Sequence, residues 1–256
     1  MTPAPEDPVE AALLPGFCTG IENLRLLKAF AGLCGPRVLD IGCYRGGGSM
    51  VLALLGKRVE AITIGAAWPK RLRPVLAPFG AEVRDLAFEA WPPDAALDGI
   101  WASHVLEHSR NPGAFLDRCR DSLKPDGWLG VVVPPFKHQV VLGHVTPGWN
   151  LGILMYALAG AGFDPSRGHF LRHGYNLAGF VPRAARVPSR HEEAFEDASL
   201  WPLPFDRRQG FDGNIAACRW TPELEARMGA GLSLLSPFGA DAALDAARRL
   251  SATWPR

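Results

Sequence analysis

Short apolar runs alternate with helix-like patterns along the first part of the chain. The runs predict strands that are buried on both faces of a sheet, and they cover residues 38–41, 59–64, 82–86, 99–103 and 128–133. Between these runs the apolar residues recur at helical spacing, which predicts helices over residues 21–33, 68–79 and 111–123. Strands and helices that alternate in this order form right-handed crossovers, so we expect an α/β fold with a doubly wound, mostly parallel sheet.

The chain beyond the fifth predicted strand follows a different pattern. A further helix is predicted over residues 151–161, and a pair of strands over residues 162–181. After Pro182 the arginine, proline and acidic residues are mixed, and this part holds a candidate strand at 214–220 and a terminal helix at 240–250. We therefore expect a main domain with an N-terminal helical segment, followed by a C-terminal extension that packs on or near the site. Their ranges are residues 1–182 and 183–256.

The first predicted strand runs directly into a glycine-rich turn. The apolar run at 38–41 ends at Gly42, and three glycines at 46–48 follow where the next helix begins. Glycine lets a ligand approach the backbone closely, and a helix N-terminus presents unpaired N–H groups to a polar or anionic ligand. Taken alone, this turn also fits a tight strand-to-helix connection that binds nothing.

The composition argues against several classes of function. The 256 residues carry 27 Lys and Arg against 26 Asp and Glu, so no basic field attracts nucleic acid. No apolar run approaches the roughly 20 residues that span a bilayer, and the acidic, proline-rich start predicts neither a signal peptide nor a transit peptide. The five cysteines are odd in number and lack the spacing of a metal site. We therefore expect a reduced, cytoplasmic protein with a small-molecule partner, no membrane and no nucleic acid.

Three motifs accompany the predicted strands. They read Val38-Leu-Asp-Ile-Gly-Cys-Tyr-Arg-Gly46, Asp98-Gly-Ile-Trp-Ala-Ser-His-Val-Leu-Glu-His108 and Leu123-Lys-Pro-Asp-Gly-Trp-Leu-Gly-Val-Val-Val-Pro134. Over residues 21–165 the chain resembles the class I S-adenosylmethionine-dependent methyltransferases, in particular the small-molecule branch that includes the ubiquinone-biosynthesis methyltransferases. The resemblance implies a Rossmann-like, doubly wound and mostly parallel sheet of seven strands, one of which is antiparallel.

The resemblance also implies a site for S-adenosylmethionine at the carboxyl ends of the strands. The glycine-rich turn matches the loop that contacts the amino acid part of the cofactor. Asp85 matches the acid that binds the adenine amine, and Leu86 would supply the adjacent N–H. Ser103 and His104 stand where the family contacts the methionine part. The cofactor-binding residues expected in this way are Asp40, Gly42, Cys43, Tyr44, Gly46, Thr63, Asp85, Leu86, Ser103 and His104.

Two positions depart from the family's pattern. Tyr44 replaces the middle glycine of the loop, which is tolerable if its backbone keeps a negative φ. Thr63 or Gly65 stands where the family has the acid that binds both ribose hydroxyls. Either Thr63 or a loop residue binds the ribose more weakly, or the chain is a non-catalytic binding or scaffold protein with a degenerate methyltransferase fold. A nicotinamide dinucleotide site is excluded, because the second glycine of its G-x-G-x-x-G fingerprint is Tyr44.

Candidate metal ligands follow the fourth predicted strand. If a helix starts there, His104, Glu107 and His108 share one face of it. A zinc peptidase has the same letters but carries them in a long helix, so we reject that class. Relatives with E-x-x-E-H at this place bind a divalent metal that positions a substrate hydroxyl. His144 would add a further ligand, with His138 as its competitor. In the alternative interpretation, Glu107 and His108 only cap and brace the start of the helix.

The expected reaction is methyl transfer from S-adenosylmethionine to a small molecule, giving S-adenosylhomocysteine. We expect transfer to oxygen, with a sugar, a quinone-like ring or another secondary metabolite as the acceptor. Without a metal, His144 or His108 would be the general base that removes the hydroxyl proton. Candidates for the acceptor pocket are Trp149, Asn150, Tyr156, Tyr175 and Asn176.

Overall fold

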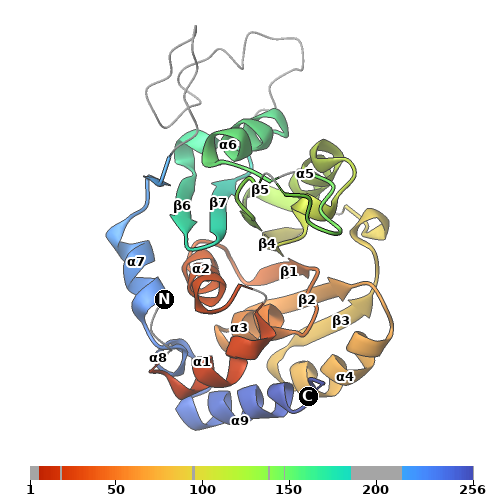
Figure 1. Ribbon diagram of the computed structural model, residues 1–256. Coiled ribbons are helices and arrows are strands. Elements are labelled where there is room, and N and C mark those ends of the chain that lie inside the picture. The colour runs from red at the N-terminus through yellow and green to blue at the C-terminus, as the bar shows by residue number, and fades with distance from the viewer. Residues whose placement is uncertain are drawn as a thin grey trace, which may run out of the picture. The chain divides into compact units, whose positions relative to one another are not determined.

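The computed structural model describes residues 6–17, 19–93, 96–137, 139–146, 148–185 and 215–255. The chain divides into two compact units, whose elements are labelled in Figure 1. The first unit contains the chain up to Trp91 together with the part from Pro222 onward, and the second contains residues 92–221. Within the described ranges, no helix combines the length and the apolar character needed to cross a membrane.

Three parallel strands form the sheet of the first unit. Their order is β3-β2-β1, and their bounds are β1 (Arg37–Ile41), β2 (Arg58–Thr63) and β3 (Ala81–Asp85). The predicted strands at 38–41, 59–64 and 82–86 are therefore confirmed to within one residue at each end. The register sets Thr63 beside Asp85. The ends of β2 and β3 thus bring two of the predicted cofactor residues together.

The helices between these strands follow the predicted pattern. They are α2 (Ile21–Ala31), α3 (Gly47–Leu54) and α4 (Ala67–Leu76), with the 3-10 turns η2 (Ala77–Phe79) and η3 (Phe88–Ala90). Pro74 lies inside α4, where it cannot donate the usual hydrogen bond to the residue four positions earlier. Helix α3 begins directly after Gly46, whose φ of 78° is left-handed. The glycine-rich turn therefore leads into a helix, as the sequence predicts.

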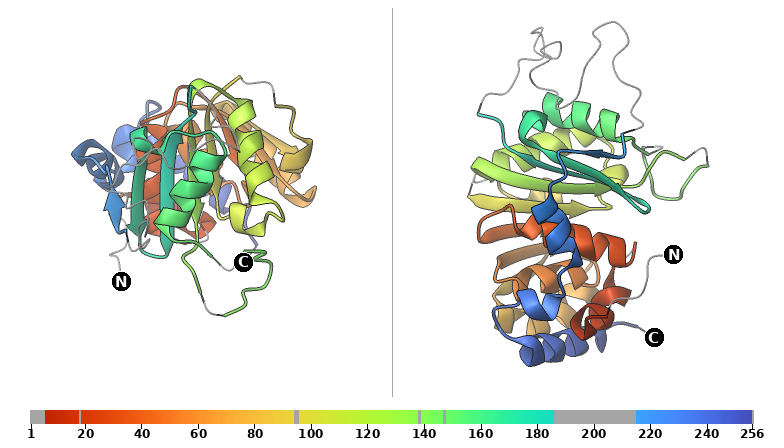
Figure 2. Two further views of the ribbon diagram at one scale, coloured as in Figure 1. Left: turned by 90° about the horizontal axis from the view of Figure 1, so that it is seen from above. Right: turned by 90° about the vertical axis from the view of Figure 1, so that its left-hand side faces the viewer.

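Both ends of the chain contribute helices to the first unit. These are α1 (Pro8–Leu13), η1 (Leu14–Gly16), α7 (Pro222–Gly229), α8 (Leu232–Leu235) and α9 (Ala240–Ser251). Helix α9 packs against α1, α3 and α4, and α7 packs against α2. Figure 2 shows α1 and α9 lying side by side. The predicted terminal helix is confirmed, whereas the division of the chain at residue 182 stays a prediction.

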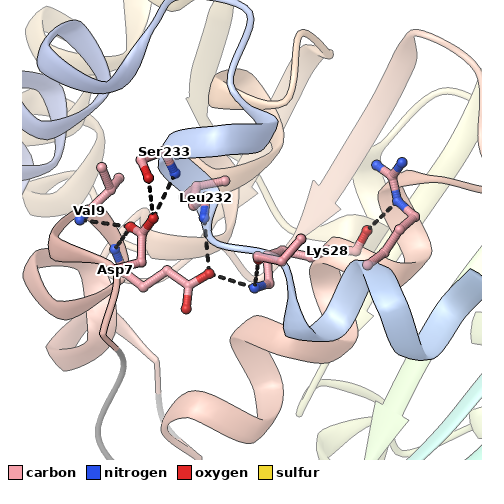
Figure 3. Close-up of polar contacts among 8 residues, drawn as sticks. Asp7, Val9, Lys28, Leu232 and Ser233 are labelled. Atoms are coloured by element: carbon pink, nitrogen blue, oxygen red, sulfur yellow. Dashed lines mark hydrogen bonds and ion pairs between the residues drawn. The ribbon is translucent and has the colours of Figure 1, made fainter.

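A buried polar cluster joins the two ends of the chain (Figure 3). Lys28 Nζ lies 2.5 Å from Glu10 Oε1, and both side chains are almost completely buried. Lys28 also donates to the carbonyl oxygen of Ala230, and Glu10 accepts from the Leu232 N–H. Asp7 caps α1 and accepts from both the N–H and the hydroxyl of Ser233. The two buried charges, Lys28 and Glu10, therefore have hydrogen-bond partners around them, which is what keeps a charge tolerable in an apolar interior.

The second unit contains a mixed sheet. Its order is β4-β5-β7-β6-β8, and its strands are β4 (Leu97–Ser103), β5 (Leu123–Val133), β6 (His169–His173), β7 (Asn176–Pro182) and β8 (Ala217–Cys218). Strands β4 and β5 are parallel, whereas the β5–β7, β6–β7 and β6–β8 pairs are antiparallel. The described residues thus contain eight strands, one more than expected, because the short β8 adds to β6.

Two helices accompany this sheet, namely α5 (Pro112–Ser122) and α6 (Leu151–Gly160), together with the 3-10 turns η4 (Leu106–His108) and η5 (Pro165–Arg167). Asn111 caps α5 and Asn150 caps α6 through their side-chain oxygens. The two helices pack against each other, α5 also contacting β5 and α6 contacting β7. They lie beside one another across the strands in Figure 2. Both helices are confirmed where the hydrophobic spacing predicts them.

Candidate functional site

The glycine-rich loop, residues 42–46, leaves the end of β1 in the first unit. The N–H groups of Gly42 and Cys43 both donate to the Ile62 carbonyl oxygen, at 2.9 and 3.0 Å. Gly42 and Gly46 have φ values of 75° and 78°, a region that glycine enters without strain. The loop is therefore tied to the neighbouring strand β2 while it turns toward α3.

Tyr44 has a φ of 42°, so the expectation of a negative φ is wrong. The turn requires a left-handed residue at this position. The glycine that is usual there adopts this conformation without strain, whereas a tyrosine does not. Half of the Tyr44 side chain is exposed, and its ring packs at a tilt on Trp68, with 5.3 Å between the ring centroids. The Arg45 guanidinium lies over the Tyr44 ring, 5.4 Å from the ring centroid. The ring contacts thus help to hold a strained residue.

Asp40 lies buried beneath the loop. Its carboxylate accepts a 2.6 Å hydrogen bond from the Ser49 hydroxyl in α3. Burial raises the pKa of Asp40 to about 6, and the Ser49 hydrogen bond opposes that rise. Burial also raises the pKa of the neighbouring Cys43 thiol far above its usual range. These two residues therefore support the loop from below, and a contact of either one with the cofactor stays a prediction.

The ends of β2 and β3 place Thr63, Gly65, Asp85 and Leu86 together. The Gly65 N–H donates to Asp85 Oδ1 at 2.7 Å, and the Leu86 N–H donates to the Thr63 carbonyl oxygen at 3.0 Å. Asp85 is exposed, so its second oxygen can receive a ligand, whereas the Leu86 N–H is already engaged. Gly65 has a φ of 102°, and no atom would lie within 4 Å of a Cβ there. Open space therefore adjoins Gly65, one of the two residues predicted to stand at the place of the family's ribose-binding acid.

His104 follows β4 in the second unit and has a φ of 54°. Its Nε2 lies 2.9 Å from Asn176 Oδ1 on β7, and its ring stacks on Tyr175. Asn176 Nδ2 donates to the His173 carbonyl oxygen, so Asn176 presents its oxygen to His104 and the His104 Nε2 must carry a proton. No local pattern in the sequence predicts this contact, because the two residues are 72 positions apart.

The helix considered for residues 104–108 does not form. The left-handed conformation of His104 prevents a helix from starting there, and only the short turn η4 forms, over Leu106–His108. Even so, the loop that follows β5 returns to this turn. The N–H groups of Val145 and Thr146 donate to the Glu107 carbonyl oxygen. This return brings His144 to the turn.

Glu107, His108 and His144 form a compact group, called here the Glu–His cluster. One ligand atom from each lies within 4.8 Å of the others. His108 Nδ1 lies 2.7 Å from the Gly143 carbonyl oxygen, which can only accept, so this nitrogen carries the proton and Nε2 keeps a free lone pair. The rings of His108 and His144 meet edge to face, with centroids 5.0 Å apart. His138, the competitor of His144, lies outside the described residues.

The carboxylate of Glu107 is the least satisfied charge of this cluster. The side chain is fully buried, and among the described residues neither of its oxygens has a hydrogen-bond partner. His104 Nδ1 lies 3.2 Å from Glu107 Oε1, a contact that does not meet hydrogen-bond geometry. A buried carboxylate without donors is costly, and a cation is the usual compensation. With two imidazoles at hand, the donor set fits a divalent transition metal.

A cavity of about 230 Å³ adjoins this cluster in the second unit. Its lining consists of Lys137, Gln139, Val140, Val141, His144, Val145 and Thr146. His144 therefore belongs both to the Glu–His cluster and to the cavity wall. Of the expected pocket residues, Trp149 is buried beside the cap Asn150, whereas Tyr156 is half exposed and Tyr175 contacts His104 and Lys137.

The family model described as a methyltransferase domain matches residues 21–180. The chain belongs to this methyltransferase family. The match begins at α2 and ends within β7, so it includes the glycine-rich loop and the Glu–His cluster. Helices α1, α7, α8 and α9 of this methyltransferase domain protein lie outside it.

Named relatives agree with the family. The ubiquinone biosynthesis O-methyltransferase of Paraburkholderia phytofirmans is 33% identical over 112 residues, which are 42% of this chain and 48% of the relative. The enzyme of the same name from Xylella fastidiosa is 38% identical over 104 residues, 39% of this chain and 42% of the relative. The matched part thus spans about half the length of these relatives or less. The expected resemblance is confirmed.

Solved structures confirm the fold. The 1,6-didemethyltoxoflavin-N1-methyltransferase of Burkholderia thailandensis, solved with bound 1,6-didemethyltoxoflavin and S-adenosylhomocysteine, aligns with a TM-score of 0.55 at 21% identity over 68% of this chain and 79% of its own. A SAM-dependent methyltransferase from Aquifex aeolicus aligns with a TM-score of 0.55 at 19% identity over 70% of this chain and all of its own. The fold is therefore the Rossmann-like methyltransferase fold.

Proposed function

We propose that this protein transfers the methyl group of S-adenosylmethionine to a hydroxyl of a small molecule, with S-adenosylhomocysteine as the second product. Family membership and the named O-methyltransferase relatives support the reaction type. The observation that carries the choice of oxygen is the Glu–His cluster, where a buried, unbonded carboxylate lies beside a free imidazole nitrogen. A sugar or another hydroxylated secondary metabolite is the proposed acceptor.

The proposed donor-binding residues of the first unit follow the carboxyl ends of its strands. The glycine-rich loop would bind the amino acid part, and the exposed Asp85 would bind the adenine amine. Thr63 would replace the ribose-binding acid with a single hydroxyl. Ser103 and His104 would contact the methionine part. Holding the acceptor oxygen in line with the methyl carbon and sulfur supplies most of the rate acceleration, because the sulfonium is already activated.

The reaction releases one proton from the acceptor hydroxyl, and a group of the protein has to accept it. As the acceptor oxygen bonds to the methyl carbon, the bond from carbon to sulfur breaks and the hydroxyl proton must leave. His108 can take it at Nε2, because its Nδ1 is already held by the Gly143 carbonyl oxygen. His144 is the second candidate, since it lies both in the cluster and on the cavity wall. Glu107 would stabilise the imidazolium that results.

A divalent metal fits the same residues. Glu107, His108 and His144 would hold it, with His104 as a further ligand if its ring leaves Asn176. A bound metal would lower the pKa of an acceptor hydroxyl and fix its orientation. The unbonded oxygens of Glu107 support this part of the proposal. We further propose a cytoplasmic location without a membrane or nucleic-acid partner, and the near balance of 27 Lys and Arg against 26 Asp and Glu supports the absence of a nucleic-acid partner.

Calorimetric titration with S-adenosylhomocysteine tests the donor site. We expect micromolar binding that is abolished by Asp85→Ala and retained by the control Glu82→Ala, an exposed residue on the same strand. No heat at millimolar ligand would contradict the proposal and favour the degenerate binding or scaffold protein. Acceptors are then sought by mass spectrometry after incubation with S-adenosylmethionine and a panel of sugars, catechols and hydroxylated metabolites. A chelator and Glu107→Ala should both lower that activity if a metal takes part.

A further inference from the structure

The glycine-rich loop is held by two chain segments that the family match does not include. Trp254 Nε1 donates to the Arg45 carbonyl oxygen at 2.9 Å. On the other side, Arg45 Nη1 donates to the Pro15 carbonyl oxygen at 3.1 Å. The family match covers residues 21–180, so both contacts come from the additional N-terminal and C-terminal parts of the chain. All of these residues belong to the first unit.

The loop needs such contacts because its backbone is strained. Tyr44 is a bulky residue in the left-handed region, with Gly46 in the same region two positions later. Arg45 lies between them, so a hydrogen bond to its carbonyl oxygen acts on the middle of the turn. The indole N–H of tryptophan is only a donor, and here its acceptor is this main-chain oxygen.

The indole ring has little freedom to move away. A Cβ built on Gly16 would lie 2.7 Å from a ring carbon of Trp254, so the ring packs directly on the backbone of Gly16. A Cβ on Gly47, the first residue of α3, would in turn lie 3.1 Å from the Gly16 carbonyl oxygen. Thr253, which precedes Trp254, has a contact of its own, because Arg71 of α4 donates to its carbonyl oxygen at 3.5 Å. The ring therefore occupies a defined position beneath the loop.

We propose that Trp254 is a positioning residue for the cofactor loop, and that the C-terminal segment of this chain is part of the donor site's support. The proposal rests on the proposed function, because the loop is taken to bind S-adenosylmethionine. Trp254 does not touch the cofactor in this assignment. It acts through the Arg45 carbonyl oxygen, which fixes the orientation of the loop's peptide groups before the ligand arrives.

The test compares Trp254→Phe with Trp128→Phe in the full-length protein. The first change removes the N–H but keeps an aromatic ring, and the second makes the same change in the middle of β5 in the other unit. We expect Trp254→Phe to weaken S-adenosylhomocysteine binding roughly three- to tenfold, the loss typical of one hydrogen bond, at an unchanged melting temperature. Trp128→Phe should bind the ligand as the wild type does.

Amide hydrogen exchange without ligand provides a second readout. Trp254→Phe should accelerate exchange in residues 42–50 and leave residues 112–122 of α5 unchanged. Gly16→Ala keeps the indole but displaces it, so it should give the same loop response if Trp254→Phe proves unstable. Wild-type affinity together with wild-type exchange in a folded Trp254→Phe variant would overturn the proposal. If the wild type itself fails to bind S-adenosylhomocysteine while the loop exchange still responds, the proposed function fails and the positioning role stands.

Discussion

The two units differ in the hydrogen-bond partners of the charged groups that they bury. In the first unit, Lys28 and Glu10 face each other, and each has an additional main-chain partner. In the second unit, Glu107 is just as buried, but neither of its oxygens has a hydrogen-bond partner among the described residues. The first arrangement holds the chain's two ends together. The second keeps an unfavourable charge in place, as expected of a group whose partner is a ligand.

This contrast assigns different roles to similar carboxylates. A satisfied ion pair contributes to folding only while both partners are present. An unsatisfied carboxylate lowers stability until a cation or substrate arrives, and residues at functional sites commonly carry such a cost. Removing the charge of Lys28 should therefore lower the free energy of unfolding, whereas removing the charge of Glu107 should leave it unchanged or raise it.

The largest effect is expected for Lys28→Met, which leaves Glu10 buried without its cation. We expect the free energy of unfolding to fall by about 3–5 kcal/mol, the usual cost of breaking a buried pair. Urea denaturation measures it. The double variant Glu10→Met/Lys28→Met should recover most of the loss, because it removes both charges. A single variant as stable as the wild type would show that the pair is not the support it is taken to be.

Glu107→Gln should have the opposite effect on stability and a large effect on activity. The amide keeps the shape of the side chain but removes the charge, so unfolding should require as much free energy as in the wild type or more. Methyl transfer should fall roughly a thousandfold, about 4 kcal/mol of transition-state stabilisation. The control Glu82→Gln changes an exposed residue and should alter neither quantity. Marked destabilisation by Glu107→Gln would contradict the contrast between the units.

The pH dependence of stability tests the buried acid beneath the glycine-rich loop. The folded pKa of Asp40 is about 6 and its ordinary value is 3.8, so the folded protein retains this proton after the unfolded chain has lost it. Stability from Asp40 is therefore fully present below about pH 4 and falls by about 3 kcal/mol as the pH rises through 6. Asp40→Asn should lack this fall in denaturation series from pH 4 to 8.

Ser49→Ala provides the opposite control. It removes the hydroxyl that donates to the ionised Asp40, so the fall in stability should extend to higher pH. Identical pH profiles for the wild type, Asp40→Asn and Ser49→Ala would show that Asp40 does not titrate in this way.

The smallest effect concerns the donor site at the end of β2. Thr63→Val removes one hydroxyl, and we expect S-adenosylhomocysteine binding to weaken roughly three- to tenfold. Thr63→Asp introduces the acid that the family has at this place and should strengthen binding, because a carboxylate accepts from both ribose hydroxyls. Unchanged affinity in both variants would assign the ribose contact to another residue.

Local patterns were sufficient for most of the fold. The strands at 38–41 and 59–64 and the helices at 21–33 and 240–250 were predicted from apolar spacing alone, because burial on a sheet or a helix face repeats with a fixed period. The extra strand β8 was predicted only as a candidate, since two residues carry almost no periodic signal. Spacing could not exclude the helix considered for residues 104–108, because it cannot reveal a single left-handed residue.

The sequence by itself determined the strand and helix order, the glycine-rich turn and the methyltransferase family, since all of these depend on neighbours along the chain. Only the tertiary structure decided that Asn176 contacts His104, that the loop after β5 brings His144 to Glu107, and that Trp254 donates to the Arg45 carbonyl oxygen. Such contacts join residues tens to hundreds of positions apart. They depend on the path of the folded chain, which the spacing of side chains along the sequence does not specify.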